Sequence, residues 1–256
     1  MVDSNNEFDL EIQKYKDIYS GNNYVFSTDS NSEGPTNGYY GDGTVTTHIT
    51  LPIIIDTINR KKRAVSILDY GCGQAKHTFE KHTKINSFLS YSDNIYTLLK
   101  GYLQCYYCYD PAVAKYNVKP SKGTLFDITM MIDVGEHIPE AYVESVIKEL
   151  FDYTKEDGVV IVSVSGSPSQ NYTTEGSSKI NLHINLKSAD WWVNVLDKNR
   201  GGKAFVLLYH WSDDRGGDNK MRYIKHNSKY MKLPDTPTVL RNMDCFNFVG
   251  TDLENR

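Results

Sequence analysis

The sequence predicts an α/β fold in which a mostly parallel sheet is covered by helices on both faces. Short apolar runs typical of buried strands recur along the chain, and segments with helical spacing of apolar residues separate several of them. This alternation favours a parallel sheet, because each parallel connection must return across the sheet, usually through a helix. No internal repeat is present that would favour a solenoid.

Local patterns place the individual elements. Helices are expected at residues 7–19, at 142–151, and after Ser188, whose hydroxyl can cap the first turn. The expected strands are the runs at residues 64–68, 104–109, 126–133, 159–164, 204–209 and 221–226. The last two runs flank Gly216 and Gly217, a turn signal that predicts a terminal antiparallel hairpin.

Length and charge bound the class of protein. The 256 residues fit a helix and flexible loop at 1–47 that could act as a lid, one α/β domain at 48–226, and a C-terminal extension at 227–256. The net charge of −4 argues against a dedicated nucleic-acid-binding protein, and no apolar run is long enough to cross a membrane. The first residues lack the basic and apolar regions of a secretory signal, so we expect a cytoplasmic protein.

A glycine turn follows the first strand of the expected domain, in the segment Asp69-Tyr70-Gly71-Cys72-Gly73. Glycines permit positive φ and let a ligand approach the backbone closely. A dinucleotide-binding turn would have a third glycine where this chain has Lys76, and a carboxylate before the glycines would repel a pyrophosphate. The carboxylate of Asp69 instead attracts a ligand with a positive charge, such as the sulfonium of S-adenosylmethionine. The turn therefore favours this methyl donor, although small glycine turns also occur as plain structure.

Acidic residues end two later strands. Asp110 follows the run at 104–109, in the position from which an acidic side chain binds ribose hydroxyls. The alternative acid, Asp93, does not lie at a strand end. Asp133 ends the run at 126–133, and the polar pair Glu136–His137 follows on the next loop. Ligands of such sheets lie at the carboxyl ends of the strands, so this loop can contact the donor or the substrate.

Taken together, the segments D-Y-G-C-G, Y-D-P, D-V-G-E-H-I-P and D-G-V-V-I-V-S-V resemble those of class I S-adenosylmethionine-dependent methyltransferases, over roughly residues 48–226. The resemblance implies a Rossmann-like, doubly wound sheet of seven strands whose last two strands form an antiparallel pair. It also implies a donor site made of Asp69, Gly71, Cys72, Gly73, Asp110, Asp133 and Val134. Members of the family more often have Leu where this chain has Gly135.

Two histidines are candidates for the catalytic base. His137 follows the strand that ends at Asp133, and His183 precedes the pair Trp191–Trp192. The ordinary pKa of histidine lies near neutral pH, so either side chain could take a proton from the methyl acceptor. The structural alternative is a residue that orders the loop for His137 and an ordinary polar loop residue for His183. The segment 183–192 is also similar to one in small phage and bacterial methyltransferases, some linked to surface-sugar modification, and we expect a small-molecule or saccharide acceptor.

Other function classes stay open. One is a protein that binds S-adenosylmethionine without transferring a methyl group, as a sensor or a donor-degrading enzyme. Another is an NAD-dependent oxidoreductase, and a third is an inactive scaffold that acts through partners. Methylation of nucleic-acid amino groups is disfavoured, because no D/N-P-P-Y-like motif follows Asp133. We expect no metal site, because Cys105 and Cys108 form only half of a zinc motif.

Overall fold

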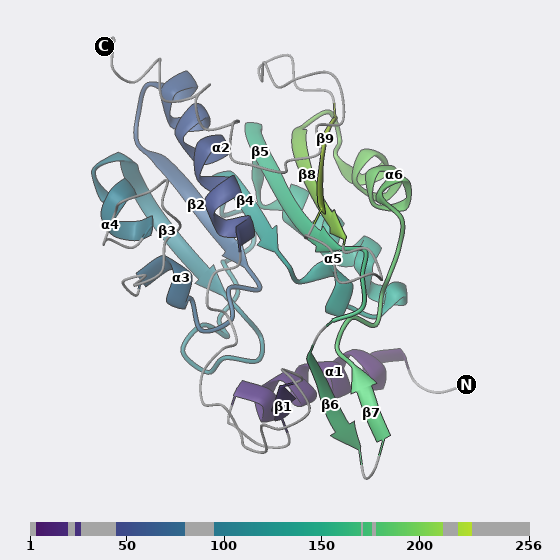
Figure 1. Ribbon diagram of the computed structural model, residues 1–256. Helices are drawn as coiled ribbons and strands as arrows, with labels where there is room; N and C mark the ends of the chain where they lie inside the picture. The colour runs from purple at the N-terminus through teal and green to yellow at the C-terminus, as the bar shows by residue number, and fades with distance from the viewer. Residues whose placement is uncertain are drawn as a thin grey trace.

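The protein is built around a central sheet of six strands. The computed structural model describes residues 4–19, 24–26, 45–79, 95–169, 171–175, 178–211 and 220–226. Within these residues the strands lie in the order β3-β2-β4-β5-β8-β9 (Figure 1). Their bounds are β2 Val65–Tyr70, β3 Leu103–Tyr109, β4 Phe126–Ile132, β5 Thr154–Ser165, β8 Ala204–Trp211 and β9 Lys220–His226.

The strands from β3 to β8 run parallel to one another, and β9 lies antiparallel beside β8 at the edge of the sheet. The predicted α/β class and parallel sheet are therefore confirmed. The seven strands are not: the described residues contribute six to this sheet. The turn expected at Gly216 and Gly217 lies outside the described residues, as does the expected C-terminal extension at 227–256.

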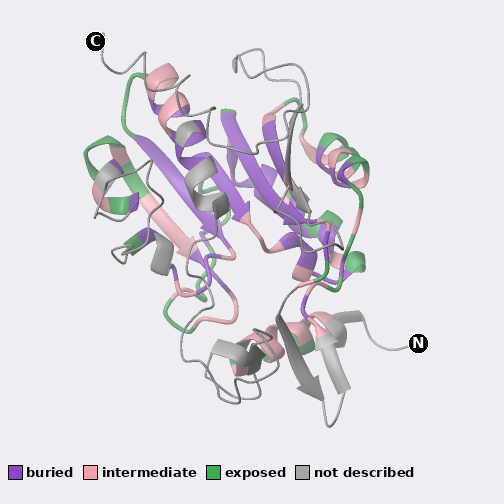
Figure 2. Ribbon diagram, in the orientation of Figure 1, coloured by how far each residue is buried: buried purple, intermediate pink, exposed green. Residues whose placement is uncertain are grey.

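Helices cover both faces of the sheet. Their bounds are α1 Ser4–Tyr19, α2 Val45–Lys61, α3 Lys76–Phe79, α4 Ile95–Leu99, α5 Glu140–Asp152 and α6 Ala189–Asn199, with 3₁₀ turns η1 Lys100–Tyr102 and η2 Gly135–His137. Helices α5 and α6 share a core with Val160 and Val162 of β5, whereas α2 and α4 share a second core with Val159 and Ile161. Strand β5 is thus buried on both faces (Figure 2), which explains its continuous apolar run. None of the described helices combines the length and apolar character needed to cross a bilayer.

Two helices match their sequence patterns closely. Helix α5 buries the apolar face that the sequence predicts, made of Val143, Val146, Ile147, Leu150 and Phe151. Helix α6 begins after Ser188, whose Oγ accepts a hydrogen bond from the Trp191 N–H at 3.2 Å. This cap satisfies one of the backbone donors that the first turn leaves without a helical partner.

A small antiparallel sheet, with the order β1-β6-β7, was not predicted. Its strands are β1 Tyr24–Phe26, β6 Asn171–Glu175 and β7 Ser178–Asn181. Figure 1 shows this sheet and α1 below the ends of the central strands. Strand β1 comes from the segment at 1–47 and pairs with β6, so the two segments meet despite their distance in sequence. A lid function for residues 1–47 stays a prediction.

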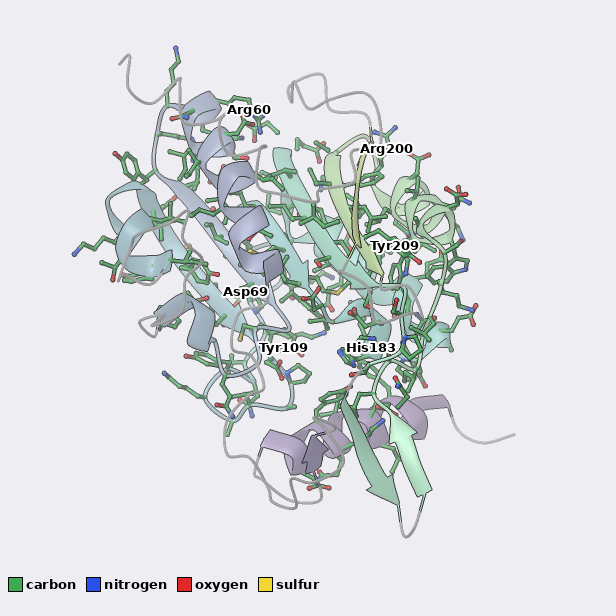
Figure 3. All side chains as sticks on the ribbon, in the orientation of Figure 1. Arg60, Asp69, Tyr109, His183, Arg200 and Tyr209 are labelled. Carbon is green, nitrogen blue, oxygen red and sulfur yellow. The ribbon has the colours of Figure 1, made fainter. Side chains whose placement is uncertain are left out.

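Four of the side chains labelled in Figure 3 mark where the parallel strands begin and where they end. Arg60 and Arg200 lie near the edge at which the parallel strands begin, whereas Asp69 and Tyr109 lie where β2 and β3 end. The sequence predicts a donor site where the strands end. A network of charges lies where the strands begin.

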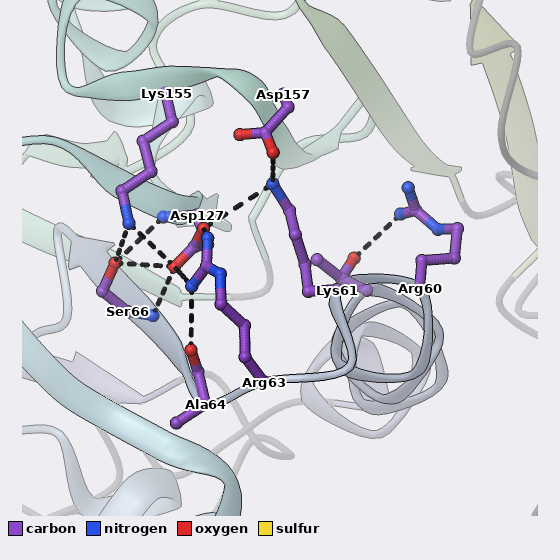
Figure 4. A network of polar contacts seen from close by, with 9 residues as sticks. Arg60, Lys61, Arg63, Ala64, Ser66, Asp127, Lys155 and Asp157 are labelled. Carbon is purple, nitrogen blue, oxygen red and sulfur yellow. Dashed lines mark hydrogen bonds and ion pairs between the residues drawn. The ribbon is translucent and has the colours of Figure 1, made fainter.

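In this network, a fully buried carboxylate joins three parallel strands (Figure 4). Asp127 in β4 accepts a hydrogen bond from the backbone N–H of Ser66 in β2 at 2.9 Å, and its Oδ2 lies 3.0 Å from Nζ of Lys155 in β5. Arg63, just before β2, donates to both carboxylate oxygens, at 2.6 and 3.0 Å. One side chain therefore links β2, β4 and β5.

The donors around Asp127 determine its charge state. Burial by itself raises the pKa of Asp127, but hydrogen bonds from Arg63, Ser66 and Lys155 outweigh burial and hold this pKa well below the ordinary carboxyl value. A carboxyl whose pKa is lower in the folded state stabilises the fold above its unfolded pKa, about 3.9 for Asp. That stabilisation is lost as the pH falls below this value towards the folded pKa.

Replacing Asp127 with Asn is expected to lower the free energy of unfolding by about 2–4 kcal/mol at pH 7, because the substitution leaves Arg63 and Lys155 without their buried anion. Urea unfolding measures this loss. Asp152→Asn is the matched control, since Asp152 pairs with Lys148 at the surface, both 63% exposed, and should change stability by less than about 0.5 kcal/mol. The gap between wild type and Asp127→Asn should narrow below about pH 4. Equal losses for the two variants at pH 7 would contradict the network's role.

Candidate functional site

The order of the strands fixes where a site can form. Strand β3 lies on one side of β2, and the strands that follow β3 in the sequence, β4, β5 and β8, lie on the other side of β2. The direction of the connections therefore reverses between β2 and β4. In open α/β sheets, ligands bind outside the carboxyl ends of the strands at such a reversal. The predicted donor residues lie at or next to the ends of β2, β3 and β4.

The glycine turn after β2 requires its glycines. Gly71 has a φ of +81° and Gly73 a φ of +55°, in the left-handed region that disfavours side chains. The N–H of Gly71 donates to the Tyr109 carbonyl at 2.7 Å, which ties the turn to the end of β3. A Cβ at Gly71 would lie 2.6 Å from Val134 Cγ2. The ends of β2 and β4 therefore meet at this contact between Gly71 and Val134.

Asp110 shapes the same turn from the end of β3. Its Oδ2 accepts the Gly73 N–H at 2.9 Å and its Oδ1 accepts the Ala112 N–H at 2.8 Å. The side chain is buried, and burial raises the pKa of Asp110, although these backbone hydrogen bonds oppose the rise. A carboxylate offers about four lone-pair sites, so the two bonds leave acceptor capacity for a ligand hydroxyl. The ribose contact stays a prediction.

Asp69, before the glycine turn, and Cys72, within it, are both buried. Asp69 is the fifth residue of β2, is 1% exposed, and accepts a hydrogen bond from the Tyr106 hydroxyl at 3.0 Å. Its negative charge, after burial, contributes to raising the pKa of Tyr106. Cys72 is also buried, and a hydrogen bond with Cys108 together with burial raises the pKa of the Cys72 thiol. This thiol is therefore protonated, which argues against a nucleophilic role.

Asp133 leaves β4 in a strained conformation. Its φ is +54°, which is uncommon for a residue with a side chain and occurs preferentially at functional sites. Ser163 holds it from β5: the Ser163 hydroxyl donates to Asp133 Oδ1 at 2.5 Å, and the Asp133 N–H donates to the Ser163 carbonyl at 2.9 Å. These two bonds hold the start of the loop that carries Val134, Glu136 and His137.

Position 135 excludes a side chain for a steric reason. A Cβ on this residue would lie 2.7 Å from Cη2 of Trp192 and 2.9 Å from Cγ1 of Val164. Trp192 belongs to α6, and its side chain is fully buried in the core between this helix and the sheet. Moving its ring aside would therefore disrupt close packing. Trp192 is therefore a core residue, and its ring takes the space that a side chain at position 135 would need.

The two predicted histidines meet beside this loop. Their ring centroids are 4.9 Å apart in an edge-to-face arrangement. One ligand atom from each of Glu136, His137 and His183 lies within 4.8 Å of the other two. Burial and the neighbouring His183 lower the pKa of His137 to about 3, although the Leu182 carbonyl opposes this. His137 is thus neutral at neutral pH.

Helix α1 reaches the histidines from the other end of the chain. The Tyr15 hydroxyl lies 2.6 Å from His137 Nδ1 and 3.5 Å from the Leu182 carbonyl. Its ring meets the His137 ring edge-on, with centroids 5.4 Å apart. Nothing in the local pattern of 7–19 distinguishes Tyr15 from an ordinary packing residue, and the sequence prediction missed it.

The structure therefore divides the predicted residues into two neighbouring groups. The first consists of the glycine turn with Asp69, Asp110, Asp133 and Val134, and the second of the two histidines. The loop after β4 belongs to both, since Val134 contacts Gly71 while His137 contacts His183. Glu136, which the sequence analysis placed with His137 on a loop able to contact the ligand but gave no role of its own, is fully buried within the second group.

A separate surface hollow lies between α5 and α6, lined by Glu140, Glu144, Trp191, Asn194, Val195 and Lys198. It contains none of the predicted site residues. Comparisons of the chain with family models, with curated proteins and with solved structures found no match. The case for a function therefore depends on the geometry above.

Replacing Gly135 with Ala is expected to lower the free energy of unfolding by about 1–3 kcal/mol, because the added methyl group overlaps the Trp192 ring. Chemical unfolding checks this. Gly101→Ala is the matched control, since a Cβ there meets nothing within 4 Å. Adding Trp192→Phe to Gly135→Ala should cost less than the sum of the two single substitutions. A Gly135→Ala protein as stable as Gly101→Ala would refute the steric explanation.

Proposed function

We propose that this protein is a methyltransferase that uses S-adenosylmethionine and acts on a small-molecule or saccharide acceptor. One observation carries the proposal. At the point where the strand connections reverse, three neighbouring strands end in a glycine turn with positive φ, in Asp110 and in Asp133. Sheets of this kind bind nucleotide-like ligands at that place.

The charges at these strand ends favour S-adenosylmethionine over a dinucleotide. Asp69, Asp110 and Asp133 are all acidic, and Lys76 occupies the position of the third glycine of a dinucleotide-binding turn. A pyrophosphate needs donors and positive potential at this point. A sulfonium and an ammonium group are attracted by carboxylates, and ribose hydroxyls can donate to them.

The reaction would be an in-line displacement at the sulfonium methyl group. The bond between sulfur and the methyl carbon breaks as the acceptor oxygen or nitrogen bonds to that carbon, and the sulfur keeps the electron pair. Holding donor and acceptor in line accounts for about 7–11 kcal/mol of barrier lowering in well-oriented systems. In this proposal His137, whose pKa of about 3 disfavours protonation, would bind the acceptor, and the acceptor's proton would pass to His183 or to solvent.

The acceptor class is the least constrained element of the proposal. The net charge of −4 disfavours a polyanionic acceptor such as nucleic acid. Trp192 is a core residue and Trp191 lines the separate hollow between α5 and α6, so neither tryptophan supports an aromatic contact with the acceptor. A saccharide or another small hydroxyl or amine compound is consistent with these features.

The donor assignment predicts that S-adenosylhomocysteine raises the melting temperature of the protein and that NAD does not. A ligand at a hundred times its dissociation constant stabilises a protein by about 2.7 kcal/mol. Asp110→Asn retains an oxygen for the Gly73 N–H but removes the charge, and should weaken S-adenosylhomocysteine binding about tenfold or more. Asp152→Asn, on the exposed end of α5, is the control and should bind normally.

Calorimetry on the folded variants decides the assignment. Unchanged affinity in Asp110→Asn would rule out the proposed ribose contact. The absence of any S-adenosylhomocysteine binding by the wild type would rule out S-adenosylmethionine as the donor. Incubation with S-adenosylmethionine and a panel of sugars and small amines should give a product heavier by one methyl substitution. Donor binding with no product across the panel would favour the second candidate, a protein that binds the donor without transferring its methyl group.

A further inference from the structure

We propose that Glu136, His137 and His183 together bind one divalent transition-metal cation. The three side chains bring two imidazoles and one carboxylate together, with one ligand atom of each within 4.8 Å of the others. Zinc bonds to nitrogen and oxygen of about 2.0–2.2 Å separate neighbouring ligands by roughly 3.4 Å in a tetrahedral site. Ligand atoms at most 4.8 Å apart can therefore share one cation after a modest adjustment of the side chains.

The hydrogen bonds of His183 orient it as a metal ligand. Its Nδ1 lies 2.6 Å from the Ser167 carbonyl oxygen, and its backbone N–H donates to Asn181 Oδ1 at 2.8 Å. A carbonyl oxygen can only accept, so Nδ1 carries the proton and Nε2 carries the lone pair in the neutral ring. Metal-binding histidines almost always have this arrangement, in which the other ring nitrogen donates to a carbonyl or carboxylate.

His137 shows the same arrangement. Its Nδ1 lies 2.8 Å from the Leu182 carbonyl oxygen, which again assigns the proton to Nδ1 and the lone pair to Nε2. The Tyr15 hydroxyl, 2.6 Å from this nitrogen, then accepts from Nδ1 and directs its own hydrogen towards Leu182 or solvent. Both rings are therefore fixed by backbone carbonyls before any cation binds.

Glu136 supplies the negative charge. Its side chain is fully buried, and its Oε1 accepts the Ser165 N–H at 2.9 Å, which fixes the orientation of the carboxylate. Its carbonyl accepts the Asn185 N–H at 2.9 Å, and this bond holds the segment that carries His183 against η2. The ligands thus come from two segments that are hydrogen-bonded to each other, as expected for a preorganised site.

The ligand types select the cation. Imidazole nitrogens favour Zn²⁺, Fe²⁺, Co²⁺ and related ions, whereas Mg²⁺ and Ca²⁺ prefer sites made of oxygen. Three protein ligands also leave a coordination position for another molecule, as in catalytic zinc sites. The role of that position rests on the proposed function: a cation there would bind the acceptor hydroxyl and make it easier to deprotonate, and solvent would receive the proton because Nε2 of each histidine is then a metal ligand. The binding of the cation does not rest on the proposed function.

The test is metal binding by the full-length chain in the absence of any methyl donor. After treatment with a chelator and its removal, titration with Co²⁺ should produce visible absorption bands that saturate at one equivalent. Calorimetry with Zn²⁺ should give the same stoichiometry, and Mg²⁺ at equal concentration should not displace Co²⁺. Binding of no cation, or of several weak equivalents without the absorption bands, would overturn the proposal.

Variants assign the ligands. Glu136→Gln and His183→Gln should each weaken binding by about tenfold or more and change the Co²⁺ bands. Glu156→Gln is the matched control, because Glu156 is 88% exposed at the start of β5, and it should bind as the wild type does. His183 is only partly buried, so His183→Gln decides the matter if Glu136→Gln does not fold. Unchanged Co²⁺ bands in a folded His183→Gln protein would overturn the proposal.

The two proposals can fail separately. Binding of S-adenosylhomocysteine by a protein that takes up no metal would end the metal proposal and leave the donor site in place. One equivalent of bound metal in a protein with no affinity for S-adenosylhomocysteine would have the opposite meaning.

Discussion

The buried carboxylate of Asp127 is the interaction on which the geometry of the central sheet depends. It bonds to groups on β2 and β5 while belonging to β4, so it fixes how far these three parallel strands are shifted along one another. A parallel sheet whose register is fixed where the strands begin also has fixed strand ends. The meeting of Gly71 with Val134 at the opposite edge, with a separation that excludes even a methyl group, requires this register. Charge pairing where the strands begin and the position of the glycine turn where they end are therefore parts of the same constraint.

Most of the central sheet could be predicted from sequence because its strands are defined locally. Each is a short apolar run, and β5 has the continuous apolar pattern of a strand buried on both faces. The capping of α6 by Ser188 and the apolar face of α5 were predictable for the same reason. The sheet β1-β6-β7 was not, because segments such as Asn171–Glu175 are short and polar and are defined by their pairing with residues far away in the sequence. The expectation of seven strands came from a resemblance, and the described residues contain six in the central sheet.

The site shows the same division. The glycine turn, Asp110 and Asp133 follow strands that could be recognised, so their position at one edge of the sheet was predictable. The contact between His137 and His183 was not, because the loop after β7 that carries His183 is positioned by the Asn185–Glu136 backbone bond. Sequence could identify each histidine as a chemically capable residue, but it could not show that both rings direct Nδ1 to backbone carbonyls. Glu136 could be recognised from sequence as a polar loop residue, but its burial and its hydrogen bond from the Ser165 N–H become evident only in the folded chain.

The contact of Tyr15 with His137 has a consequence for how the chain matures on the ribosome. Helix α1 is synthesised well before the groups it touches, His137 and the Leu182 carbonyl. The nascent helix therefore lacks these neighbours until residues 137 and 182 have emerged. Isolated helices of this length are marginally stable in water. The two histidines can thus acquire their complete surroundings only after β2 to β5 have been synthesised.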